Sequence, residues 1–170
     1  MPEYKIRKAI PDDAQKIIDF INAIISEPNS NLEMSEGEFL HTEEEEKKLL
    51  ADFHDSANSL YLIAEIDNEI IGNLVGHGSN RRASRHCVSI SMSVAREWRG
   101  KGIGKALMQK SIDWARNSSI VKRMDLIVFA RNQAAIHLYE SVGFVKEGIL
   151  QKSIFRDEQY LDAYIMALLL

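Results

Sequence analysis

The sequence places a cluster of glycines between a strictly alternating segment and an amphipathic one, and this junction limits the fold more than any other feature. Residues 87–94 alternate, with Val88, Ile90, Met92 and Val94 on one side and Cys87, Ser89, Ser91 and Ser93 on the other. This period of two predicts a β-strand whose serine face leaves room for a ligand. Residues 102–117, with Leu107, Ile112 and Trp114 among their apolar positions, are predicted to form a helix.

The junction itself, residues 99–104, has the properties of an anion site. Its three glycines can adopt positive φ angles and let a phosphate approach the backbone closely. The first amides of the following helix have no acceptors within the helix, and the helix dipole adds partial positive charge there. Full positive charges are added by Arg99, Lys101 and Lys105. The spacing fits neither a Walker loop nor a Rossmann fingerprint, so the alternatives are a pyrophosphate cradle of another kind and an ordinary glycine-containing turn.

The remaining patterns predict an α/β protein with a mixed sheet. Strands are expected over residues 4–8, 60–66, 69–76, 124–129, 145–155 and 160–169, and helices over 11–27, 42–54 and 132–142. Thr42 followed by Glu45 is a capping-box pattern, and Asp67-Asn68 is a hairpin-type turn pair. Because helices alternate with strands in the second half, we expect at least one parallel strand pair beside antiparallel hairpins.

Composition and charge exclude several classes of protein. The 170 residues are 45% apolar and 27% charged with a net charge of −4, which fits one domain over residues 1–170 and argues against a nucleic-acid binder. Cys87 is the single cysteine, which excludes an internal disulfide and a cysteine-based zinc cluster, and the histidines lack metal-ligand spacing. Residues 1–5 show no signal-peptide core and the longest apolar stretch, 165–170, cannot span a bilayer, so we expect no membrane association and a cytoplasmic location.

Two segments match known motifs in both order and spacing. Residues 99–104 read Arg-x-x-Gly-x-Gly, and residues 132–144 read Asn-x-x-Ala-x-x-Leu-Tyr, three further residues and Gly-Phe. They resemble the two signature segments of the GCN5-related N-acetyltransferases, the GNAT family. Residues 147–150 and 160–164 resemble the branch with polyamine, ribosomal-protein N-terminal and phosphinothricin-type acetyltransferases. The resemblance implies a GNAT-like fold: a central, mostly antiparallel, twisted sheet with one parallel pair splayed at the cofactor site, and helices on both faces.

The resemblance also implies that acetyl-CoA is the co-substrate, without a metal, and it gives roles to particular positions. The backbone of Met92, Ser93 and Val94 would pair with the pantetheine arm. The amides that would hold the pyrophosphate belong to Arg99, Gly100, Lys101, Gly102, Ile103, Gly104 and Lys105. Asn132 would hydrogen-bond the cofactor arm, Ala135 would pack against it, and Tyr139 would stand near the thioester sulfur.

The chemistry of acetyl transfer agrees with the role of Tyr139. Attack of an amine on a thioester releases a thiolate, and a phenol with a pKa of about 10 can protonate it. The alternative is that Tyr139 belongs only to the core. An alkylammonium must also lose a proton before attack, and the strand 87–94 offers serines rather than a carboxylate for this step. Candidates for the base are Glu27, Glu33, His77 or a chain of water molecules.

We therefore expect transfer of an acetyl group from acetyl-CoA to a primary amine of a small molecule or peptide, by direct attack in a ternary complex. The alternative is a non-catalytic acetyl-CoA-binding regulatory module, in which the cleft beside Ser91 and Ser93 would be filled. The acceptor stays open: the acidic stretch 33–46 would suit a polycation, and the irregular segment 26–41 is the expected specificity element. Arg81, Arg82 and Arg85 are expected in a solvated loop. A homodimer is an expectation that comes from the family alone.

Overall fold

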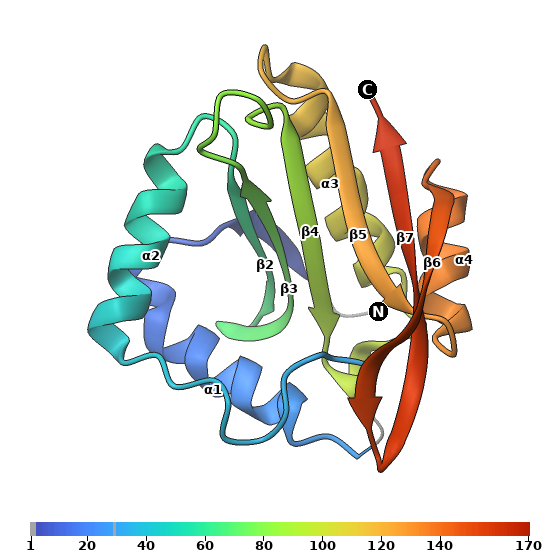
Figure 1. Cartoon of the computed structure of the whole chain (residues 1–170). Coiled ribbons are helices and arrows are strands. Elements are labelled where there is room, and N and C mark those ends of the chain that lie inside the picture. Colours follow the sequence, from blue (N-terminus) through green and yellow to red (C-terminus); the bar gives the residue numbers. More distant parts are fainter. Residues whose placement is uncertain (1–2, 29) are drawn as a thin grey trace.

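A seven-stranded sheet with helices on both faces runs through the chain (Figure 1). The computed structural model describes residues 3–28 and 30–170. The helices are α1 (Ala14–Ile25), α2 (Glu43–Asp55), α3 (Ile103–Asn117) and α4 (Gln133–Ser141), and short 3₁₀ turns cover Pro11–Asp13 and Arg96–Trp98. The strands are β1 (Lys5–Lys8), β2 (Leu60–Ile66), β3 (Glu69–Gly78), β4 (Cys87–Val94), β5 (Arg123–Phe129), β6 (Val145–Arg156) and β7 (Gln159–Leu169). Their order in the sheet is β1-β2-β3-β4-β5-β7-β6.

The parallel pair β4–β5 is the feature of the sheet that positions the site. All other neighbouring strands pair in the antiparallel sense. The parallel ladder begins with Cys87 opposite Arg123 and stops with Ser89 opposite Asp125, although β4 continues to Val94 and β5 to Phe129. The two strands therefore diverge over their second halves (Figure 1). This confirms the predicted fold class, a mostly antiparallel sheet with one splayed parallel pair.

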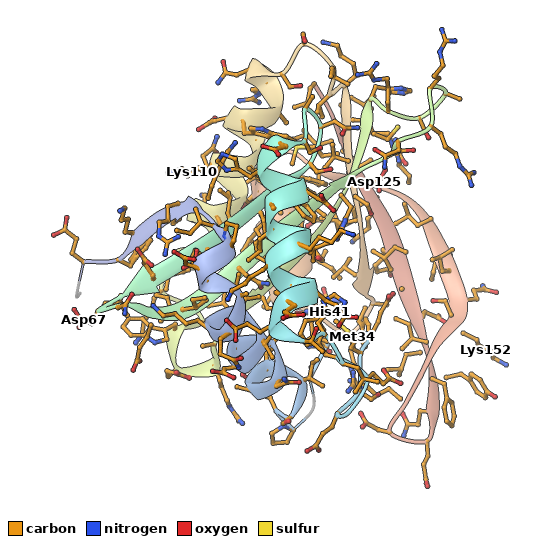
Figure 2. All side chains as sticks on the ribbon, turned by 90° about the vertical axis from the view of Figure 1, so that its left-hand side faces the viewer. Met34, His41, Asp67, Lys110, Asp125 and Lys152 are labelled. Atoms are coloured by element: carbon orange, nitrogen blue, oxygen red, sulfur yellow. The ribbon has the colours of Figure 1, made fainter. Side chains whose placement is uncertain are left out.

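Two apolar cores lie on opposite faces of the sheet. The larger core packs α3 and α4 against the sheet and includes Leu107, Ile112, Met124, Leu126 and Ile136. The smaller core packs α1 and α2 against β2 and β3 and includes Ile17, Leu50, Phe53, Tyr61 and Ile63. Figure 2 looks onto the second layer and shows that α1 and α2 leave the part of this face formed by β5, β7 and β6 uncovered. None of the helices in the described ranges is long and apolar enough to span a membrane.

Local sequence signals explain several element boundaries. The Thr42 hydroxyl accepts a hydrogen bond from the Glu45 amide, and the Glu45 carboxylate accepts one from the Thr42 amide at 2.8 Å. The predicted capping box therefore begins α2. Asp67 and Asn68 adopt φ angles of 46° and 68°, as the tight turn between β2 and β3 requires. These two predictions are confirmed.

The structure differs from two expectations that rest on local sequence patterns. β3 extends two residues beyond the predicted end, because His77 and Gly78 still pair with Ser89 and Val88 of β4. His77 therefore lies within a strand beside the serine face. Glu46, which belongs to the acidic stretch that would suit a polycation, is buried, and its carboxylate lies 2.7 Å from His41 Nδ1.

One arginine ties the first strand to both the first helix and the second strand. The Arg7 guanidinium donates to both carboxylate oxygens of Asp13, at 2.7 and 2.8 Å, and to those of Glu65, at 2.9 and 2.7 Å. Asp13 is buried and also accepts the Ile10 amide at 2.9 Å. Burial acts to raise the pKa of Asp13, but the hydrogen bonds from Arg7 and Ile10 and the charge of Arg7 outweigh it, so the pKa lies below its usual value.

Changing Arg7 to Met should lower the free energy of unfolding by on the order of 3 kcal/mol at pH 7, because the buried Asp13 carboxylate loses its cation. A carboxyl with a lowered folded-state pKa stabilises the protein above its unfolded pKa of about 4, and this contribution disappears as the pH falls through the folded-state value. The difference between wild type and Arg7→Met in urea unfolding should therefore shrink below about pH 4. The exposed Arg82→Met is the control, with an effect within about 0.5 kcal/mol. A pH-independent difference would contradict this role of Asp13.

Candidate active site

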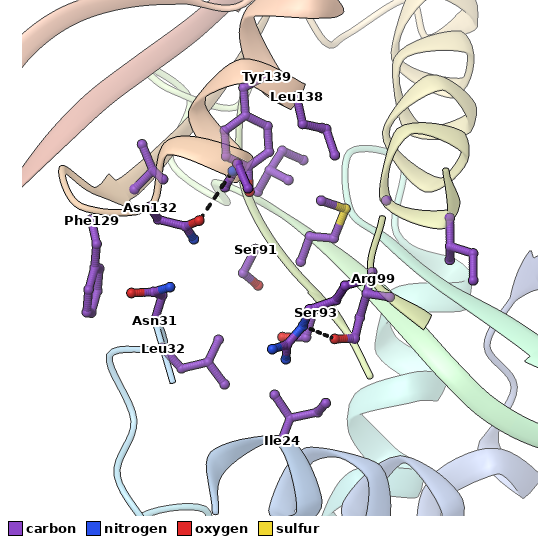
Figure 3. Close-up of a pocket in the computed structure, with 18 of the residues that line it drawn as sticks. Ile24, Asn31, Leu32, Ser91, Ser93, Arg99, Phe129, Asn132, Leu138 and Tyr139 are labelled. Atoms are coloured by element: carbon purple, nitrogen blue, oxygen red, sulfur yellow. Dashed lines mark hydrogen bonds between the residues drawn. The ribbon is translucent and has the colours of Figure 1, made fainter. Parts of the chain in front are cut away.

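A cavity of about 690 Å³ opens where β4 and β5 diverge (Figure 3). The sheet contributes residues 89–94 and 127–129, together with His77 of β3. The glycine junction and the first turn of α3 contribute residues 98–100 and 102–105, and the second motif contributes Asn132, Ala134, Ala135, Leu138 and Tyr139. Ile24 and residues 31–34 complete the lining. The structure thus brings to one cavity every residue predicted to contact the cofactor, including Tyr139, except Lys101, and their roles toward a cofactor stay predictions.

The glycine junction forms a backbone cradle at the start of α3. Gly100 and Gly102 adopt φ angles of +72° and +85°, a left-handed conformation that favours glycine. Gly102 precedes the helix, whose first internal bond runs from the Ala106 amide to the Gly102 carbonyl at 3.0 Å. The amides of residues 103–105 therefore lie at the helix N-terminus without acceptors in the helix, which suits an anion. Lys105, in the same turn, lines the cavity and adds a full charge.

Gly104 has a packing role as well. A Cβ atom on it would lie 3.0 Å from Leu138 Cδ1 and 3.3 Å from Met92 Cε. The bare glycine lets α3 approach both β4 and α4 at the point where the two motifs meet. The first two glycines therefore shape the backbone, and the third permits close contact between elements.

The charged side chains of the junction differ from the sequence expectation. Arg99 donates from Nε to the Val94 carbonyl at 2.8 Å and from a terminal nitrogen to the Glu27 carboxylate at 2.5 Å. The Arg99 charge is thus compensated by a carboxylate instead of being free for an anion. Lys101 Nζ lies 4.6 Å from the ring centre of Trp98, and Lys101 is outside the cavity lining. Of the three expected cations, Lys105 lines the cavity and has no such partner among the residues that the structure describes.

The second motif places an amide and a phenol at the cavity (Figure 3). Asn132 begins α4, because its Oδ1 accepts the Ala135 amide at 3.2 Å. This bond leaves the two protons of the Asn132 Nδ2 group as donors. Tyr139 is buried, with its ring centre 6.0 Å from that of Phe144. Burial raises the pKa of Tyr139 to about 12, so the phenol keeps its proton at neutral pH.

The candidate bases fall into two groups. Glu27 is held by Arg99 and does not line the cavity, whereas Glu33 and His77 do. The His77 ring lies 5.0 Å from that of Phe53, and desolvation lowers its pKa. His77 is therefore neutral at pH 7 and able to accept a proton. The loop arginines at 81, 82 and 85 are exposed and lie outside the lining, as expected of a solvated loop.

Sequence reasoning missed the apolar residues on the open side of the cavity. Ile24, Leu32, Ile127 and Phe129 line it together with Met34. In the sequence these residues belong to the apolar positions of a helix or a strand, or stand alone in a loop, and no pattern separates them from core residues. Ile127 is 52% exposed, which the periodicity of its short apolar strand does not indicate. In the described part of the chain, no group of three His, Cys, Asp or Glu side chains is placed to hold a metal.

Comparison with known proteins agrees with this geometry. The model of the acetyltransferase (GNAT) family matches residues 26–144, which is more than half of the sequence. This chain belongs to the GNAT family. A solved acetyltransferase of the GNAT family from Streptococcus pneumoniae has a TM-score of 0.96 and 31% sequence identity, over 99% of this chain and 100% of that one.

Two relatives whose names state a substrate match this chain over a smaller share of their length. The L-amino acid N-acetyltransferase AaaT of Escherichia coli is 35% identical over 62% of this chain and 65% of its own length. The spermidine N(1)-acetyltransferase of Vibrio cholerae is 28% identical over 68% and 66%. The chain thus matches about two thirds of each relative, and their names indicate different acceptors.

The cradle geometry predicts a specific effect of changing Gly102 to Ala. The left-handed φ angle costs a non-glycine residue roughly 1 kcal/mol, and the added methyl group stands where a phosphate would approach. We expect acetyl-CoA to bind roughly tenfold more weakly in isothermal titration calorimetry. Gly37→Ala is a matched control, because Gly37 has a φ angle of +81°, has equal space around it and lies outside the cavity. Both variants should lose similar stability, and equal acetyl-CoA affinities in the two would contradict the cradle.

Proposed function

We propose that this protein transfers the acetyl group of acetyl-CoA to a primary amine by direct attack in a ternary complex. The observation that supports this proposal most is that the cradle and Tyr139 line one continuous cavity, which is open beside Ser91 and Ser93. A non-catalytic acetyl-CoA-binding module would need no such space for a second substrate. The open side therefore favours an enzyme over a regulatory module. Membership of the GNAT family supports the same donor and reaction.

The geometry supports a specific path for the donor. The edge of β4 that faces away from β3 loses its partner after Ser89, so its free backbone groups around Met92, Ser93 and Val94 can pair with the pantetheine arm like an added strand. The pyrophosphate would then reach the amides at the start of α3. The free Nδ2 group of Asn132 would hydrogen-bond the arm from the side of β5.

The proposed reaction needs one proton acceptor and one proton donor. The ammonium first loses a proton, and the neutral amine attacks the thioester carbonyl to form a tetrahedral oxyanion. This intermediate expels the CoA thiolate, which takes the phenolic proton of Tyr139, while the product amide forms. The raised pKa of Tyr139 keeps this proton in place until the thiolate develops. Of the candidate bases, His77 fits best, since it is neutral and lies beside the serine face.

Changing Tyr139 to Phe tests the acid role. Without the phenolic proton, kcat should fall about 100-fold, as is typical for loss of a general acid. The dissociation constant of acetyl-CoA should change little, because the ring and its packing are kept. Tyr164→Phe on β7, outside the cavity lining, is the control and should retain wild-type kcat. Turnover can be followed by release of free CoA thiol, and an unchanged kcat in Tyr139→Phe would exclude the acid role.

The base can be identified from the pH profile of kcat/KM. If His77 accepts the ammonium proton, kcat/KM should rise with pH through a group whose pKa lies below the usual histidine value of about 6.5. His77→Gln should remove this acidic limb and lower kcat/KM about 100-fold. Glu33→Gln, which removes the other lining candidate, should keep the limb. The reverse outcome would assign the base to Glu33.

A further inference from the structure

On the sheet face that carries α1 and α2, five apolar side chains line the cavity beside the serine face of β4, and we call this part the acceptor half. They are Ile24 of α1, Leu32 and Met34 of the loop that follows α1, and Ile127 and Phe129 of β5. Figure 3 labels Ile24, Leu32 and Phe129 among them. Ile127 is 52% exposed in this position. Exposed apolar side chains in a cavity favour a ligand that has apolar surface to bury, and the neighbouring serines offer it hydroxyl groups.

Two arginines from the second half of the chain hold this wall in place. Arg131, directly after β5, donates to Asn31 Oδ1 at 3.0 Å. Arg156, at the end of β6, donates to the carbonyls of Leu32 and Met34. These contacts hold residues 30–34 beside the cavity, where Leu32 and Met34 line it.

Neither of these two arginines is among the residues that line the cavity. Arg131 also donates to Asp157 at 3.5 Å, and Arg156 donates to the carbonyls of Leu32 and Met34. Among the described lining residues the arginine and lysine are Arg99, bound by Glu27, and Lys105, which belongs to the first turn of α3 on the opposite sheet face. A free carboxylate that entered the acceptor half would lose water without gaining a cation, which is costly.

The acceptor half also offers few carboxylates to a polycation. Glu33 is the one acidic residue among the described lining residues. In the acidic run at the start of α2, Glu45 accepts hydrogen bonds from Thr42, and Glu46 is buried against His41. Glu43 pairs with a lysine one turn along α2 at 2.6 Å. Of the acidic stretch 33–46 that would suit a polycation, Glu33 is thus the one carboxylate that the described cavity lining contains.

We infer that the acceptor is a primary amine with an apolar body, a single positive charge and no carboxylate. This inference rests on the proposed acetyl transfer and deepens it. It separates the protein from an enzyme for free amino acids, which carry a carboxylate next to the amine, and from one for polyamines. The amine of a small hydrophobic molecule and the N-terminus of a peptide that begins with an apolar residue share this chemistry.

A panel of matched acceptors tests the inference on the wild-type protein. 3-Methylbutylamine is leucine without its carboxylate, and 3-(methylthio)propylamine is methionine without it. We expect kcat/KM for each amine to exceed that of its amino acid at least about tenfold, and to exceed that of spermidine. Equal or higher values for leucine, methionine or spermidine would overturn the inference. Leu-Ala-Ala-amide in the same panel distinguishes a peptide N-terminus from a small amine as the preferred source.

A charge introduced into the acceptor half should reverse the preference. Ile127→Arg places a guanidinium on the apolar wall, so the ratio of kcat/KM for 3-methylbutylamine to that for leucine should fall about tenfold. Ile149→Arg on β6 is the matched control, because Ile149 is similarly exposed at 48% but lies outside the cavity, and its ratio should equal the wild-type ratio. An unchanged ratio in an Ile127→Arg protein that still binds acetyl-CoA would contradict the inference.

The outcomes also separate this inference from the proposed function. Acetyl-CoA binding without release of CoA thiol for any amine in the panel would refute acetyl transfer, and the acceptor inference with it. Turnover with a preference for free amino acids or spermidine would refute the acceptor inference alone. Turnover of the carboxylate-free apolar amines supports both.

Discussion

The divergence of β4 and β5 is the constraint on which the site depends. Within a sheet, buried backbone amides and carbonyls need partners, and a strand that leaves its neighbour exposes a row of them. Here β3 satisfies one edge of β4 as far as Val94, while the ladder to β5 stops at Ser89. The free edge and the cavity beside it are thus two results of one change in strand direction. The glycine junction follows β4 after one short 3₁₀ turn, so the anion cradle lies at the end of that free edge.

The packing of the molecule keeps the two strands apart. The core with α3 and α4 supports one face of the divergent region, and Gly104 allows α3 to contact α4 and β4 together. On the other face α1 and α2 cover β2 and β3 and leave β5 uncovered, so the loop between these helices forms the outer wall. Contacts from Arg131 and Arg156 to this loop join segments more than 100 residues apart in sequence. The cavity is therefore assembled from both halves of the chain.

The periodic parts of the fold could be predicted from sequence, because short-range patterns specify them. The alternation in 87–94 and the apolar run 60–66 gave strands with the observed bounds, and the glycine junction pointed to the cradle. What failed depends on contacts between distant residues. Arg99 pairs with Glu27, which lies 72 residues away in the sequence, and this pairing leaves no pattern there. The apolar acceptor wall was missed for the same reason, since Ile127 resembles an ordinary core position until the sheet opens beside it.

The ion pair between Glu27 and Arg99 joins the loop that forms the acceptor wall to the cradle for the donor. Glu27 lies just after α1, at the start of the loop that forms the acceptor wall, and Arg99 belongs to the cradle for the donor. A donor that drew the guanidinium away from Glu27 would release one anchor of that loop. By linkage, any factor by which the donor changes acceptor affinity must equal the factor by which the acceptor changes donor affinity. In that case this one salt bridge would couple binding in the donor half of the cavity to binding in the acceptor half, in both directions.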